Sequence, residues 1–181
     1  AIAEKRINSK EAVLFRLANQ LYNGRMSFSS VCESIRRDLL AECPDSLFGR
    51  SFSIENPTPW YGKRGLAYFL YEYEEYLYGA GEPKISWASI FNGQKKTIEH
   101  ILPQNPEEGG YWTDHFTVEE REKLIHQIGN LTLTEDNGPL GNKPFSTKKG
   151  VFGQESPCYA NSNLKIEQEL CLFTDWTPST I

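Results

Sequence analysis

The apolar residues of this chain recur mainly at the spacing of an amphipathic helix, about every three to four positions. Two short stretches depart from this spacing and follow the pattern of strands. In one, the apolar residues Ile98, Ile101 and Leu102 enclose Glu99 and His100, and Pro103 ends the stretch; in the other, Leu131 and Leu133 alternate with threonines. We therefore expect an α+β fold that is mainly α. The helical spacing predicts helices at residues 9–22, 29–41, 62–78, 117–127 and 164–173.

The region around the two expected strands predicts a ββα unit. Thr117 and Glu120 have the spacing of a capping box at the start of a helix between the strands. Residues 136–149 are rich in Asn, Gly, Pro and Lys, and we expect a loop there that becomes helical near Ser146. The expected organisation is one compact domain with three parts: a helical subregion at 1–96, the ββα unit at 97–150 and a terminal helix packing on the body at 151–181.

The composition fits a globular protein with its own core. A chain of 181 residues suffices for one ordinary domain or two small ones, and 39% of its residues are hydrophobic. No run approaches the about 20 apolar residues that cross a bilayer, so no membrane partner is expected. The chain starts without Met and without an apolar leader segment. We interpret it as a C-terminal piece of a longer protein.

Cysteine spacing and charge narrow the possible sites. No cysteine belongs to a Cys-x-x-Cys pair or lies near a histidine at zinc spacing, so we expect free thiols and no structural zinc, with two disulfides as the alternative. The net charge of −5 argues mildly against a nucleic-acid binder. However, residues 1–64 carry ten Lys or Arg against seven Asp or Glu. Salt screening limits the reach of a charge to about 8–10 Å. An acidic chain can therefore still bind a phosphate backbone through a local group of positive charges.

Glu99 and His100, adjacent in the first expected strand, carry the main candidate chemistry. Hydrolysis of a phosphodiester needs an activated water, neutralisation of the phosphoryl oxygens and help for the leaving oxygen. A neutral imidazole accepts a proton near pH 7, so His100 is the candidate general base. Successive strand residues face opposite sides, so Glu99 shares a site with His100 only if the strand twists near its end at Pro103.

A hard ion such as Mg²⁺ prefers oxygen ligands, and Mn²⁺ is the second candidate. Glu99 together with an amide oxygen from Asn137 or Asn142 would suit such an ion.

Three further residues are expected to assist His100. Asn130, at the start of the second strand, is expected to orient the imidazole through a hydrogen bond. Lys148 and Lys149 lie on the expected helix after it, where they and the helix N-terminus can meet the scissile phosphate.

The order of these residues resembles the HNH, or His-Me finger, nucleases, whose site is a β-hairpin and a helix around one metal ion. More narrowly, the chain resembles the C-terminal nuclease module of GmrSD-type modification-dependent restriction enzymes. The stretches that carry the resemblance are residues 98–104, 128–133 and 137–148, with a looser match at 60–64 and around Trp176. The resemblance implies a helical body around a ββα-metal finger.

The resemblance also assigns roles by position. It implies that His100 is the catalytic base and that Asn130 is the Asn of the second motif. Asn137 and Asn142 both remain candidates for the third motif, and the usual gap from Asn130 favours Asn137. The third-position histidine and the zinc-binding cysteine pairs of many HNH proteins are absent from this sequence, so packing must support the finger.

Other charged residues have two interpretations. His126 is expected to be a helix-end or packing residue, and His115 a surface residue. Paired cations such as Lys95 and Lys96 are either DNA contacts or part of a solvated loop. The expected DNA contacts are Lys63, Arg64, Lys95, Lys96, Lys143 and Lys149.

The leading hypothesis is a metal-dependent DNA endonuclease of a prokaryotic, cytoplasmic restriction or phage-defence system. Its substrate would be double-stranded DNA, possibly modified. The resemblance implies an NTPase-like sensor domain in the same or a partner chain. These 181 residues contain no phosphate-binding Gly-rich loop, so we expect that domain to lie outside them. The alternatives are a catalytically silent DNA-binding module with the same fold and a regulatory module that contacts the NTPase.

Overall fold

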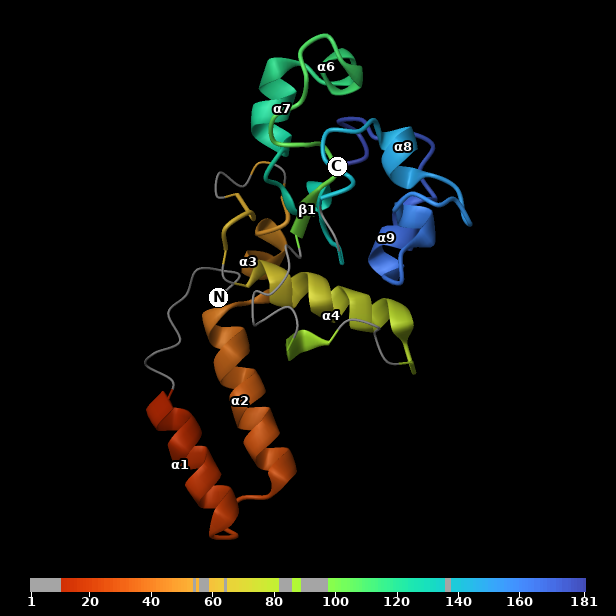
Figure 1. The fold of residues 1–181 in the computed structure, drawn as a ribbon. Helices are drawn as coiled ribbons and strands as arrows, with labels where there is room; N and C mark the ends of the chain where they lie inside the picture. The colour runs from red at the N-terminus through yellow and green to blue at the C-terminus, as the bar shows by residue number, and fades with distance from the viewer. Residues whose placement is uncertain are drawn as a thin grey trace. The chain divides into compact units, whose positions relative to one another are not determined.

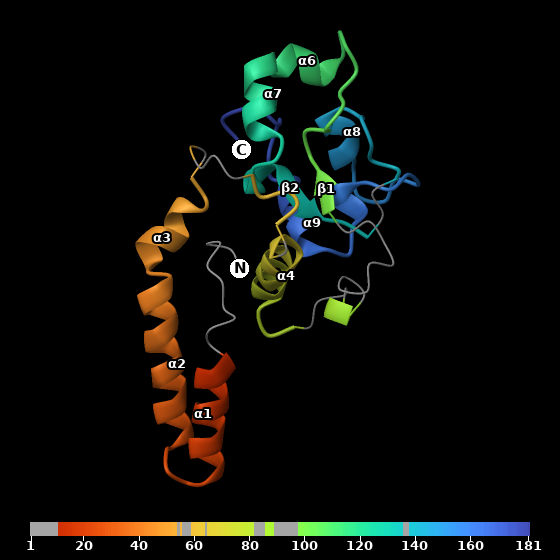
Figure 2. The ribbon, with the colours of Figure 1, turned by 90° about the vertical axis from the view of Figure 1, so that its left-hand side faces the viewer.

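The computed structural model describes residues 11–53, 55, 59–63, 65–81, 86–88, 98–135 and 138–181. Contacts between residues divide the chain into two compact units, 1–56 and 57–181 (Figures 1 and 2). The described elements are α1 (Glu11–Tyr22), α2 (Phe28–Glu42), α3 (Asp45–Arg50), α4 (Leu66–Tyr78), β1 (Ile98–His100), α6 (Tyr111–His115), α7 (Val118–Leu124), the short 3₁₀ helix η2 (Ile128–Asn130), β2 (Leu131–Leu133), α8 (Phe145–Lys149), the 3₁₀ helix η3 (Tyr159–Asn161) and α9 (Lys165–Leu170).

The first unit is a helical hairpin followed by a short helix. Helices α1 and α2 run side by side in opposite directions, joined at a turn where Gly24 has a φ of 66° (Figures 1 and 2). Ser27 caps the N-terminus of α2, because its Oγ accepts from Ser30 N at 3.1 Å. This bond provides a partner for one of the first backbone N–H groups, which have none within the helix. Leu17 and Val31 are the buried apolar residues of the pair.

The second unit is built around the hairpin of β1 and β2. The two strands pair antiparallel, with Glu99 opposite Thr132 and His100 opposite Leu131. Helices α6 and α7 lie at one end of this hairpin and α4 lies at the other, with α9 packed on α4 (Figures 1 and 2). The buried Glu74 of α4 joins these helices, because its carboxylate accepts the N–H groups of Lys165 and Ile166 at 2.8 and 2.7 Å.

One hydrophobic core unites this second unit. Its buried members come from between and after the strands: Ile101, Leu102, Trp112, Phe116, Leu124, Leu140, Phe145, Tyr159, Leu170 and Trp176. The expected parts at 97–150 and 151–181 therefore share one core and both fall within the unit 57–181. The boundary expected at residue 96 does not coincide with the boundary between the two units.

The mainly helical α+β class is confirmed. So is the capping box, because Thr117 Oγ1 accepts from Glu120 N at 3.2 Å and Glu120 Oε2 accepts from Thr117 N at 2.8 Å. Three helices are shorter than predicted, those expected at 62–78, 117–127 and 164–173. Each begins or ends where the backbone hydrogen bonds of a turn replace those of the helix. The sequence pattern missed α3 and α6, which are too short to show a period. In the described part of the chain, no helix is long and apolar enough to cross a membrane.

Candidate active site around His100

His100, the last residue of β1, lies in a cluster of ring and amide groups and is only 5% exposed. Its Nε2 lies 3.1 Å from Nδ1 of His126, and its Nδ1 lies 3.3 Å from Nε2 of Gln104. Its ring and the ring of Tyr61 meet edge to face, with 4.4 Å between centroids. Burial is the largest cause that lowers the pKa of His100 from 6.5 to about 4, and the electrostatic effects of His126 and Lys148 act in the same direction. The imidazole is therefore neutral at pH 7 and able to accept a proton.

His126 reaches this cluster from the end of α7. Its ring stacks on Tyr61, with 5.2 Å between centroids and 13° between planes. Its carbonyl oxygen accepts the backbone N–H groups of Trp60 and Tyr61 at 2.9 and 3.3 Å. These contacts join residues 60 and 61 to the end of α7 and place His126 beside His100. The sequence indicated only a packing residue here, since a single histidine in a helix carries no spacing signal.

The side chain of Asn130 is fully buried and does not contact His100. Its Oδ1 accepts from the backbone N–H of Leu102 at 2.7 Å and from Trp176 Nε1 at 3.3 Å. Its Nδ2 donates to the carbonyl oxygens of Leu102 and Ile125, both at 3.0 Å. The expected hydrogen bond from Asn130 to the imidazole is therefore wrong, because the amide has used its two donors and two accepting positions. Asn130 instead fixes the chain that leaves β1.

Glu99 and Lys148 form a buried ion pair. Lys148 Nζ lies 2.6 Å from Glu99 Oε1 and donates to the carbonyl oxygens of His100 and Ile101, both at 3.0 Å. Burial raises the pKa of Glu99 and lowers the pKa of Lys148, and the charge of each partner opposes the shift of the other. Lys148 is 0% exposed, so its ammonium is not available to a phosphate. The structure brings these two predicted site residues together, away from the imidazole of His100.

The expected metal ligands do not assemble in the described part of the site. The carboxylate of Glu99 is held by Lys148, and strand alternation directs it to the face of β1 opposite His100. Asn142 is exposed and donates to the carbonyl oxygen of Asn105 at 2.8 Å, and Asn137 lies outside the described residues. Within the described ranges there is no group of three or more His, Cys, Asp or Glu that would hold an ion. Glu99 and Asn142 thus have other partners in this structure, and the predicted Mg²⁺ ligand set as a whole stays a prediction.

Comparison with known proteins decides the family. The model of the C-terminal domain of GmrSD restriction endonucleases matches residues 45–181. The chain belongs to this family. No curated protein and no solved structure matches it.

Membership in the GmrSD C-terminal family confirms the resemblance in the sequence. It indicates a nuclease domain of the restriction-endonuclease type, with DNA as the substrate. The matched region starts at Asp45, so α1 and α2 precede it.

Three of the cationic residues predicted to contact DNA lie among the described residues of this GmrSD-family domain. Lys63 lies over the ring of Trp60, 5.3 Å from its centroid. Lys143 is exposed, whereas Lys149 donates to the carbonyl oxygen of Phe173 at 3.0 Å. The other predicted contacts lie outside the described residues: Arg64, Lys95 and Lys96.

A hollow of about 490 Å³ adjoins the His100 cluster. His126 and Gln104, the two residues that hydrogen-bond His100, both line it. Its other walls come from α7 and from the chain after β1: Asn105, Pro106, Glu108, Val118, Arg121, Glu122 and Ile125. This hollow therefore reaches the two side chains that hydrogen-bond His100.

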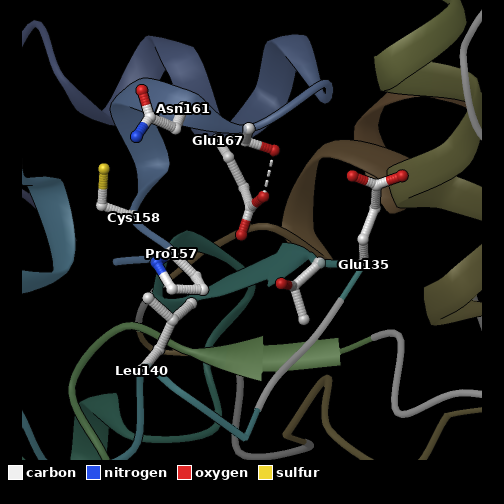
Figure 3. Close-up of a pocket in the computed structure, with 8 residues that line it drawn as sticks. Glu135, Leu140, Pro157, Cys158, Asn161 and Glu167 are labelled. Atoms are coloured by element: carbon white, nitrogen blue, oxygen red, sulfur yellow. Dashed lines mark hydrogen bonds between the residues drawn. The ribbon is translucent and has the colours of Figure 1, made fainter. Parts of the chain in front are cut away.

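A second, smaller hollow of about 130 Å³ lies beside β2 and α9 (Figure 3). Glu167 of α9 points into it and accepts a hydrogen bond from the hydroxyl of Ser162 (Figure 3). Burial raises the pKa of Glu167 to about 7, against the hydroxyl groups of Ser162 and Thr134, which favour its charged form. This carboxyl is therefore partly protonated at neutral pH.

Proposed function

We propose that this GmrSD-family domain is an endodeoxyribonuclease of the HNH, or His-Me finger, type. The observation that carries the proposal is the neutral imidazole of His100, held at the end of β1 by contacts to both ring nitrogens. The β1–β2 hairpin and α8, joined through Glu99 and Lys148, supply the ββα order that such a finger requires. His100 would take a proton from the attacking water while the water oxygen bonds to phosphorus and the 3′-oxygen leaves.

A divalent cation remains part of this proposal through the resemblance to HNH nucleases. Mg²⁺ is the first candidate and Mn²⁺ the second. It would stabilise the charge on the phosphoryl oxygens. Because Glu99 is paired with Lys148, the ligands of such an ion must come from residues other than this carboxylate unless the ion pair opens.

The biological setting is proposed on the same basis. The family points to restriction of foreign DNA, and modified double-stranded DNA would be the substrate. A nucleotide-hydrolysing sensor domain, in this protein or in a partner, would control cleavage. The setting would be the cytoplasm of a prokaryote.

A catalytically silent DNA-binding module is the second candidate function. One observation favours it: the predicted pair of base and metal ligand is not assembled, since Glu99 and His100 contact different partners. A silent module would bind DNA with a salt-dependent affinity and would cut none. Its contacts with a sensor domain would then be its function.

Cleavage of a supercoiled plasmid, with and without modified bases, separates these candidates. The domain would be incubated with Mg²⁺, Mn²⁺ or a chelator, beside His100→Ala and the matched variant His115→Ala. The nuclease proposal expects nicking that requires the divalent ion, is lost in His100→Ala and persists in His115→Ala. Unchanged cleavage by His100→Ala would exclude His100 as the base. DNA binding without cleavage under every metal would establish the silent module.

A further inference from the structure

The family resemblance gives no role to the contact between His100 and His126. Nε2 of His100 lies 3.1 Å from Nδ1 of His126. A hydrogen bond at this distance requires that one of the two nitrogens carries a proton and that the other accepts the hydrogen bond. Both rings also touch Tyr61, one edge-on and one stacked. The arrangement fixes the plane of each imidazole as well as the hydrogen bond between them.

Gln104 decides the direction of this hydrogen bond. Its amide nitrogen lies 3.3 Å from Nδ1 of His100, and an amide N–H donates, so Nδ1 accepts. In neutral His100 the single proton then resides on Nε2 and is donated to Nδ1 of His126. The lone pair of neutral His100 is thereby kept on Nδ1, where it accepts from Gln104, and Gln104 lines the large hollow.

The backbone explains why His126 can hold His100 in one orientation. His126 is itself anchored by the N–H groups of Trp60 and Tyr61 on its carbonyl oxygen, and by ring stacking on Tyr61. Asn130 cannot take this role, because its amide is saturated by Leu102, Ile125 and Trp176.

We propose that His126 is the positioning residue for His100. It sets the tautomer and ring orientation that keep the accepting lone pair of His100 on Nδ1, where the attacking water would replace the amide of Gln104 as the donor. This inference rests on the proposed nuclease function. When His100 takes up the water proton at Nδ1, the hydroxide oxygen bonds to phosphorus, and the resulting imidazolium donates its Nε2–H to His126. A hydrogen bond from a charged donor is stronger than one from a neutral donor, so the contact favours the protonated base as it forms.

The groups that surround His126 are compatible with this role. The ring of Tyr61 covers one of its faces, and His100 lies at its Nδ1. The charged groups that share the large hollow with it are Arg121, Glu108 and Glu122.

The test compares two substitutions of His126 in the full chain. In His126→Asn the side-chain oxygen occupies the place of Nδ1 and still accepts from His100 Nε2, whereas His126→Leu removes the acceptor. We expect His126→Leu to lower kcat for plasmid nicking about 10- to 100-fold with little change in KM. His126→Asn should stay within about threefold of the wild type. The matched control is His115→Leu, which loses a similar half-buried imidazole that bonds Tyr111 and Asp175, and its kcat should not change.

A second readout does not depend on cleavage. Nitrogen-15 NMR of the histidine rings should show the proton of neutral His100 on Nε2 in the wild type and in His126→Asn. In His126→Leu we expect a mixture of the two tautomers. Wild-type kcat in His126→Leu, equal losses in both variants, or an unchanged tautomer in His126→Leu would each overturn the positioning role. If cleavage were lost only in His100→Ala, the proposed nuclease function would stand without the positioning role. If the wild type were inactive but showed the expected tautomers, the nuclease function would be contradicted and the contact between His126 and His100 supported.

Discussion

Lys148 Nζ lies 2.6 Å from Oε1 of Glu99, on the side of β1 away from His100. A lysine with no exposed surface and a glutamate that is 3% exposed form this pair. Two neighbours in the sequence motif, Glu99 and His100, thus belong to different environments: one holds α8 to β1, and the other faces α7. In this motif Glu99 therefore has a structural role, whereas His100 is the candidate for its chemistry.

The Glu99–Lys148 pair predicts a strong coupling between two substitutions. Glu99→Gln or Lys148→Met alone should lower the free energy of unfolding by about 3–5 kcal/mol, because each leaves a buried charge without its partner. The double variant should recover most of that loss. Urea unfolding of the four proteins measures the coupling. If Glu99→Gln instead unfolds like the wild type and loses only metal-dependent cleavage, the carboxylate is a metal ligand after all.

Asn130 predicts a large loss of stability when its amide is removed. Asn130→Ala leaves buried groups of Leu102, Ile125 and Trp176 without partners, at about 1–3 kcal/mol each. We expect the free energy of unfolding to fall by about 3 kcal/mol or more. Asn142→Ala is the matched control, since Asn142 is exposed and makes a single side-chain bond to Asn105, and it should cost below about 1 kcal/mol. Equal losses in denaturant unfolding would contradict the role assigned to Asn130.

The lowered pKa of His100 predicts an unusual pH profile for cleavage. With a pKa of about 4, the imidazole stays neutral down to mildly acidic pH. The kcat/KM for nicking should therefore show no fall near pH 6.5, where an ordinary histidine takes up its proton. Rates measured from pH 5 to 8 at constant ionic strength check this. A descending limb centred near pH 6.5 would show that the base is more exposed in the working enzyme.

His100 and Glu167 affect stability with opposite signs. The pKa of His100 is lower in the folded chain than its ordinary 6.5, so the unfolded chain binds the proton first and this contribution is lost as pH falls from 6.5 towards 4. The pKa of Glu167 is raised from 4.5 to about 7, so the folded chain binds that proton more tightly, and the contribution is lost as pH rises from 4.5 through 7.

Glu167→Gln isolates the second of these effects. Gln is neutral at every pH and can still accept from Ser162. The Tm of Glu167→Gln relative to the wild type should therefore be higher at pH 8.5 than at pH 4.5. Thermal unfolding at both pH values measures the difference. A Tm difference that is the same at both would show that Glu167 keeps an ordinary pKa.

The sequence predicted the parts of this domain that depend on local pattern. The long helices have an apolar period, the capping box at Thr117 has a fixed spacing, and the hairpin has two short apolar runs. The family followed from motifs in the right order. The short helices α3 and α6 were missed because five or six residues hold too little of a helical period.

The partners of the site residues were harder to predict than the residues themselves. Alternation in β1 predicted different faces for Glu99 and His100, and the two side chains have different partners. No local rule identified Lys148, 49 residues later, as the partner of Glu99. In the same way, nothing near Asn130 specifies Leu102 or Trp176. The position of His126 beside His100 depends on how α7 meets residues 60 and 61, which is a matter of tertiary packing. The metal set stays a prediction, because Asn137 lies outside the described residues.

The four hydrogen bonds of Asn130 have a consequence for the order of folding. Three of them connect positions 28 or 46 residues apart in the sequence, so these three cannot form until distant parts of the unit have come together, whereas the bond to Ile125 is local. Contacts of such separation form slowly, because the chain between them must first be closed into a loop. We therefore expect the hairpin and His100 to reach their final packing late in folding, together with the rest of the unit. A peptide cut at residues 97 and 150 would carry every motif and still lack the indole that completes the Asn130 amide.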